Sequence, residues 1–192
     1  MLENVLVKRG CSLKVRLTVK SLLSVGLVVL AVVLPQLVHL VYGAAGGVTW
    51  LPMYLPVLLG GCLLGWAWGL GIGIASPLVS FAITFAFGDP MPAAARLPFM
   101  VVELAVFAAV SGLFTKKIAQ NGWIAFPAVL LTQIAGRATF MLLVLATQSV
   151  SSLAPQMIWA QIQTGFVGMI LQAALVPFIV MGLRAILNKD KE

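Results

Sequence analysis

The sequence predicts an all-α membrane protein with six transmembrane helices. Hydrophobic residues make up 61% of the 192 residues and charged residues only 9%, and the mean hydropathy is +1.10. A soluble domain carries about a quarter of its residues as Asp, Glu, Lys and Arg, so most of this surface must face lipid. The apolar runs are continuous rather than alternating, which favours helices over barrel strands.

The apolar runs give the predicted spans. The stretch 51–87 contains no charged residue. As one helix it would be about 55 Å long, too long for a hydrocarbon core of about 30 Å. We therefore expect it to turn back near 66–71 and form two short spans, with Pro77 kinking or breaking the second. The other four spans are predicted over residues 21–39, 97–114, 123–146 and 158–187.

The chain is predicted to form one transmembrane domain over residues 1–192, with a basic segment at 1–19 and a short tail at 188–192. Its charged start resembles that of a signal peptide, but no small-residue cleavage site follows, so we expect a retained first helix. Cys11 lies in the basic segment and Cys62 in an apolar run, so no disulfide is expected.

The basic residues predict the orientation. With six spans and both termini in the cytoplasm, only Arg96 falls in an outer loop. Cytoplasmic loops of membrane proteins carry an excess of Lys and Arg, so this distribution favours the six-span arrangement in a cell membrane. The basic residues that it assigns to the cytoplasmic side are Lys8, Arg9, Lys14, Arg16, Lys20, Lys116, Lys117, Arg184, Lys189 and Lys191.

Two ionisable residues lie inside predicted spans, Glu103 in span 97–114 and Arg137 in span 123–146. An ionisable group at membrane depth costs several kcal/mol unless it is paired or hydrated, which makes each a candidate functional residue. Their positions predict depths of about 9 Å and 13 Å from the outer side. Two interpretations are compatible: a structural ion pair, or a pair at the floor of an outward-facing pocket, with Arg137 binding an anionic or carbonyl group.

Other polar and aromatic residues gather at the same predicted level. Gln133 lies one helical turn from Arg137 on the same face, and Gln161, Gln163 and Gln172 follow in the last span. Such amides either bind a ligand or join helices. Aromatic residues near the outer loops are equally typical of an interfacial belt, and the single histidine, His39, is expected there too. The candidate substrate-binding residues are Glu103, Arg137, Gln133, Trp159, Gln163, Trp50, Tyr54 and Arg96.

Motifs for catalysis are absent from the sequence. It has no nucleotide-binding Lys-Ser/Thr loop, no zinc-binding His pair and no nucleophile elbow, and one histidine provides no metal site. Gly61, Gly65, Gly69 and Gly73 recur every four residues, which is typical of close helix packing rather than phosphate binding. We therefore expect no enzymatic activity, no cofactor, no metal and no nucleic-acid partner.

Five segments carry a resemblance to a known family: 71–80 (GIGIASPLVS), 88–92 (GDPMP), 97–113 (LPFMVVELAVFAAVSGL), 134–137 (IAGR) and 168–177 (GMILQAALVP). With the length and the six predicted spans, the chain resembles the S component of bacterial energy-coupling factor (ECF) transporters. The resemblance implies an S-component-like bundle in the bacterial cell membrane that captures a vitamin or related micronutrient at its outer face. Its implied partners are a membrane coupling subunit and two ATPase subunits.

Two further points stay open at the level of sequence. A self-sufficient secondary transporter of a small polar solute is the alternative function, which internal repeats and broken helices would favour. The ligand is not identified: folate, pantothenate, cobalamin and a pyrimidine-type precursor all suit a pocket with one acid, one guanidinium, several amides and aromatic walls.

Overall fold

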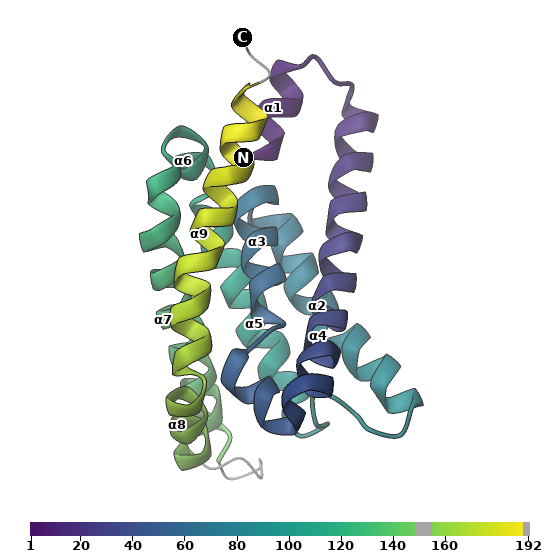
Figure 1. Cartoon of the computed structure of the whole chain (residues 1–192), viewed down its shortest axis with the longest axis vertical. Coiled ribbons are helices and arrows are strands. Elements are labelled where there is room, and N and C mark those ends of the chain that lie inside the picture. The colour runs from purple at the N-terminus through teal and green to yellow at the C-terminus, as the bar shows by residue number, and fades with distance from the viewer. Residues whose placement is uncertain (149–154, 190–192) are drawn as a thin grey trace.

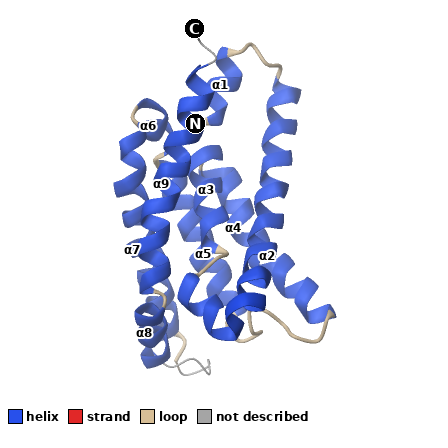
Figure 2. Ribbon diagram, in the orientation of Figure 1, coloured by secondary structure: helices blue, strands red, loops and turns tan. Residues whose placement is uncertain are grey.

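A computed structural model describes residues 1–148 and 155–189, and within these ranges the chain forms helices and connecting loops only (Figures 1 and 2). The elements in chain order are α1 (Leu2–Lys8), α2 (Leu13–Trp50), α3 (Tyr54–Leu64), α4 (Trp66–Ala86), α5 (Leu97–Leu113), α6 (Thr115–Gln120), the 3-10 turn η1 (Gly122–Ile124), α7 (Ala125–Ala146), α8 (Pro155–Thr164) and α9 (Phe166–Lys189).

Five segments of the described chain are long and apolar enough to cross a membrane: 13–43, 45–64, 66–86, 122–146 and 166–187. These helices indicate a multi-pass membrane protein. The 17-residue α5 is apolar but shorter, about 26 Å at the standard helical rise. Six spans with both termini in the cytoplasm therefore stay a prediction.

Glycines end or bend helices close to the predicted turns. Gly43 lies inside α2 with φ 66° and ψ −166°, which folds the end of α2 away from its main axis. Gly65 separates α3 from α4 with φ 94°, one residue before the turn predicted at 66–71. Both are left-handed conformations that glycine adopts at little cost. By contrast, α4 continues through Pro77 as one helix, so the alternative of a break at Pro77 is not observed.

The last predicted span is divided. Residues 158–187 were expected as one helix, but α8 ends at Thr164 and α9 begins at Phe166, with Gly165 between them. Gly165 and Gly168 fit closely against the end of α2, since a Cβ at Gly168 would lie 2.5 Å from the Thr49 carbonyl oxygen. The amide of Gln172 donates to the Leu51 carbonyl oxygen at 2.9 Å. The break thus lies where α9 packs against the end of α2.

Helix α3 lies at the centre of the bundle and packs against α5, α4, α2 and α9. The four-residue glycine spacing allows this packing. A Cβ at Gly61 would lie 2.6 Å from the Ala108 carbonyl oxygen, and one at Gly73 would lie 2.5 Å from the Leu104 carbonyl oxygen. The prediction of close helix packing is confirmed at Gly61, Gly69 and Gly73, whereas Gly65 forms the turn.

The end of the bundle with the N-terminus carries α1, α6 and the end of α9, and with them most of the described basic residues (Figure 1). Glu3 pairs there with Lys20 and, at 2.8 Å, with Arg16. The hydrogen bond and charge of Lys20, with the charge of Arg16, hold the pKa of the Glu3 carboxyl below its usual value. Arg184 donates to the Ala119 and Gln120 carbonyl oxygens at the end of α6.

The opposite end of the bundle carries α8, the end of α2 and the 87–96 loop.

Candidate binding cavity

A buried polar cluster joins three helices below the end of the bundle opposite the chain termini. Glu103 of α5 pairs with Arg137 of α7, with 2.9 Å between Oε1 and Nη1. The Tyr54 hydroxyl of α3 donates to Glu103 Oε2 at 2.6 Å, and the Arg137 guanidinium carbon lies 5.0 Å from the centre of the Tyr54 ring. The prediction that Glu103 and Arg137 lie at one level with opposite charge is confirmed by this contact.

Packing holds this cluster in place. Glu103 and Tyr54 are 1% and 3% exposed and Arg137 is 6% exposed, so each charge depends on the other for compensation. The Phe107 ring meets the Tyr54 ring edge-on, with 5.0 Å between centroids. Phe107 reaches this position because Gly136 has no side chain: a Cβ there would lie 2.0 Å from the Phe107 ring.

The Arg137 guanidinium keeps spare hydrogen-bonding capacity. Its three nitrogens are buried, and none donates a hydrogen bond to the part of the chain that the structure describes. The 2.9 Å contact with Glu103 is therefore a charge contact that is not aligned as a hydrogen bond. The amide of Gln133, one turn earlier on α7, donates instead to the Met169 carbonyl oxygen of α9 at 2.9 Å.

Glu103 and Tyr54 also form part of the wall of a cavity of about 380 Å³. Pockets that hold small ligands have volumes of about 300–1,000 Å³. Segments from α2, α3, α4, α5, α7, α8 and the connections before α3 and α5 surround it, so its wall combines residues far apart in sequence. Its polar lining residues are His39, Tyr54, Ser80, Arg96, Glu103 and Gln161.

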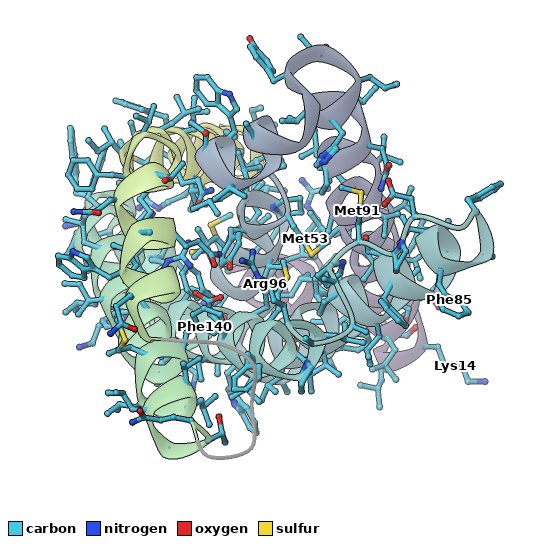
Figure 3. All side chains as sticks on the ribbon, turned by 90° about the horizontal axis from the view of Figure 1, so that it is seen from below. Lys14, Met53, Phe85, Met91, Arg96 and Phe140 are labelled. Atoms are coloured by element: carbon cyan, nitrogen blue, oxygen red, sulfur yellow. The ribbon has the colours of Figure 1, made fainter. Side chains whose placement is uncertain are left out.

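The rest of the lining is mainly apolar and includes three methionines, Met53, Met91 and Met100, together with Phe140. Figure 3 looks onto this end of the bundle, and Arg96, Met53 and Met91 lie near one another at its centre. Methionine side chains are flexible and polarizable, so they can adapt to the shape of an apolar group.

The connection between α4 and α5 is fixed to α4. Ser80 Oγ donates to the Met91 carbonyl oxygen at 2.9 Å, and the Met91 N–H donates to Thr84 Oγ1 at 2.8 Å. These bonds hold Met91 against the cavity shortly before Arg96. Arg96 precedes α5 directly with a helical backbone conformation, and Met100 and Glu103 follow at spacings of four and three residues, so the three share one face.

Three buried polar atoms on residues of the cavity wall have no hydrogen-bond partner among the described residues: His39 Nδ1, Glu103 Oε1 and Gln161 Oε1. Buried polar atoms are usually hydrogen-bonded to protein or water. The ring of His39 also packs against Gly47, where a Cβ would lie 3.0 Å from His39 Cε1. These atoms therefore keep hydrogen-bonding capacity that the described residues do not use.

The structure brings some of the predicted site residues together and separates others. Tyr54, Arg96 and Glu103 line the cavity. Arg137 lies behind Glu103 and, with Gln133, lines an open apolar groove between α7, α8 and α9. Glu103 rather than Arg137 lines the cavity in this arrangement, and the hypothesis that Arg137 binds the substrate stays a prediction.

Trp50, Trp159 and Gln163 do not line the cavity. Trp159 is 58% exposed on α8, and Gln163 is exposed on the same helix. Trp50 packs against Tyr42, with 5.8 Å between their centroids. These positions favour the alternative of an interfacial aromatic belt for Trp50 and Trp159.

Sequence reasoning left Gln161 open between ligand binding and helix packing, and it did not assign His39 or the three methionines to the site. Spacing provides one usable signal, since Met100 lies between Arg96 and Glu103 on a shared helical face. His39 has no comparable signal. Gly43 and Gly165 redirect α2 and the last span near them, and such changes in direction are not visible as periodicity.

No protein-family model matches this sequence, and neither a curated protein nor a solved structure does. Among the described residues no three His, Cys, Asp or Glu side chains are grouped in a way that could hold a metal ion.

Proposed function

We propose that this chain is the substrate-binding membrane subunit of an ECF-type importer, which captures a vitamin or related micronutrient for import driven by partner ATPase subunits. The observation that carries the proposal is the cavity of about 380 Å³ at one end of an apolar helix bundle, with Glu103 and Tyr54 in its wall. A binding subunit needs a site of this kind at one membrane face. The resemblance in segments 71–80, 88–92 and 97–113 supplies the transporter class.

The orientation follows from the same proposal. The cavity lies at the end away from Lys116, Lys117 and Arg184. If basic loops mark the cytoplasmic side, the cavity opens toward the outside of a bacterial cell membrane. Ligand capture from outside then requires a partner to supply energy, because the sequence contains no nucleotide-binding motif.

Reconstitution tests this function. The purified chain in liposomes, given a panel of radiolabelled vitamins and precursors, should bind one of them without accumulating it. Co-expression with a coupling subunit and its two ATPases should add ATP-dependent uptake of that compound. Concentrative uptake by the isolated chain on a proton or sodium gradient would contradict the proposal.

That contrary result would favour a self-sufficient secondary transporter. Helices broken within a span, next to the binding site, are typical of secondary transporters. Gly43 and Gly165 interrupt helices near the cavity, but they lie at the ends of the candidate spans 13–43 and 166–187. Co-purification with ATPase subunits from a native membrane separates the two functions.

A further inference from the structure

We infer that the cavity binds a small, elongated organic anion whose anionic group pairs with Arg96 and whose opposite end carries hydroxyl or amide N–H donors facing Glu103. This inference deepens the proposed function and rests on it. It concerns the chemical class of the ligand, for which the sequence leaves several vitamins open.

The charges along α5 carry the first step. Arg96 lines the cavity and forms no ion pair with any residue that the structure describes. Glu103 lines it two helical turns further on, but Arg137 lies 2.9 Å behind Glu103 and balances its charge. The cavity is therefore left with one uncompensated positive charge, at Arg96, and an anionic ligand group would compensate it.

The N-terminal ends of two helices add to the positive electrostatic potential that Arg96 creates in the cavity. Helices α3 and α5 both begin at the cavity wall, and neither has a side-chain cap. The N-terminus of a helix carries a partial positive charge. The C-terminal end of α2 lies nearby, and its carbonyl groups carry the opposite, negative partial charge. The Gln172 amide donates a hydrogen bond to the Leu51 carbonyl oxygen there, which offsets part of that negative charge. The positive potential thus adds to that of Arg96.

The hydrogen-bonding groups define the other end of the ligand. Glu103 Oε1 is buried without a hydrogen bond to a described residue, and so is Gln161 Oε1. Glu103 Oε1 already lies 2.9 Å from Arg137 Nη1, but neither oxygen accepts an aligned hydrogen bond, and donors on the ligand would supply one. A cationic donor is not needed because Arg137 already balances Glu103. Hydroxyl and amide N–H groups satisfy these atoms without adding charge.

Helix geometry sets the length of the ligand. Arg96 and Glu103 are seven residues apart on one face of α5, which corresponds to about 10 Å along the axis. Between them the wall is apolar, with Met53, Met91 and Met100. The volume of about 380 Å³ lies near the lower limit for ligand pockets, so a molecule as large as cobalamin does not fit.

The test separates a bacterial small-molecule extract into anionic, neutral and cationic fractions by ion exchange, and measures the melting temperature of the detergent-purified chain with each. The anionic fraction should stabilise the wild-type chain, and the other two should not. Stabilisation by the neutral or cationic fraction alone would overturn the ligand class while leaving a binding function. No stabilisation by any fraction would instead count against the proposed function itself.

Variants at Arg96 test the placement of the anion. Arg96→Gln should require at least about tenfold more of the anionic fraction for half-maximal stabilisation, because a charge-assisted hydrogen bond is lost. Arg96→Lys should lose less, since it keeps the charge. The control is Lys14→Gln, which removes an exposed charge that Figure 3 shows apart from Arg96. Equal responses of Arg96→Gln and wild type would overturn the role of Arg96.

Discussion

Glu103 and Arg137 depend on each other because each is almost fully buried. The pair is 2.9 Å apart, and Tyr54 contacts both members, with its hydroxyl on Glu103 and its ring facing Arg137. An unpaired charge left in such surroundings is far more costly than the loss of a surface ion pair. The cluster therefore stabilises the junction of α3, α5 and α7 whatever else it does.

The single variants Arg137→Met and Glu103→Met should each lower stability by about 3–5 kcal/mol, because each leaves one buried charge without its partner. The double variant should be less destabilised than the sum of the two, since it removes both charges together. Melting curves of the three proteins in one detergent measure this coupling. Additive losses would mean that the two side chains do not compensate each other.

Arg137→Lys provides a matched control for that cycle. A lysine keeps the positive charge near Glu103 but lacks the planar guanidinium that lies over the Tyr54 ring. We expect an intermediate melting temperature, between those of wild type and Arg137→Met. Stability equal to wild type would show that the geometry over Tyr54 contributes nothing.

At the scale of elements, the close approach of α3, α4 and α5 depends on glycines at their contacts. Gly73 of α4 faces the backbone of α5 at Leu104, whereas Gly71, two residues earlier, has no neighbouring atom within 4 Å of the position of a Cβ. The two glycines thus lie on opposite sides of one helix. Replacing either glycine with alanine adds the same methyl group, so the two substitutions form a matched comparison.

Gly73→Ala should destabilise the protein by about 1–3 kcal/mol, because the new methyl group would lie 2.5 Å from the Leu104 carbonyl oxygen and force α4 away from α5. Gly71→Ala should be neutral or slightly stabilising, since alanine favours helix more than glycine does. Melting temperatures of both variants check this. Similar values for the two would contradict the α4–α5 contact.

For the whole molecule, the two ends of the bundle differ in chemistry. One end carries the chain termini, α1, α6 and most of the basic residues, and the other carries the cavity and Arg96 (Figure 1). This asymmetry leads to the prediction of orientation, with the cavity outside and the basic end in the cytoplasm.

Cysteine labelling of intact cells tests the orientation. In a background without Cys11 and Cys62, a membrane-impermeant thiol reagent should label Ala94→Cys in the exposed connection before α5, but not Lys117→Cys in α6. Ser151→Cys in the predicted outer loop should also be labelled, although Ser151 lies outside the described residues. The reverse labelling pattern would contradict the six-span topology.

The sequence by itself determined the properties that composition and periodicity carry. The low charge content indicates a membrane protein, and the uncharged stretch 51–87 requires a turn, which the structure has at Gly65. The depths of Glu103 and Arg137 follow from helical rise alone, so their pairing was predictable. These properties depend on residues close together in the sequence or on simple counting.

Only the tertiary structure decided which side chains face the cavity. Glu103 and Arg137 share a level, yet Glu103 faces the cavity and Arg137 lies behind it, because the rotation of α5 and α7 depends on contacts such as Gly136 with Phe107. His39 and Gln161 join the wall through changes of direction at Gly43 and Gly165. In lipid, apolar residues cover all sides of a helix, so hydrophobic periodicity does not reveal which side faces the interior.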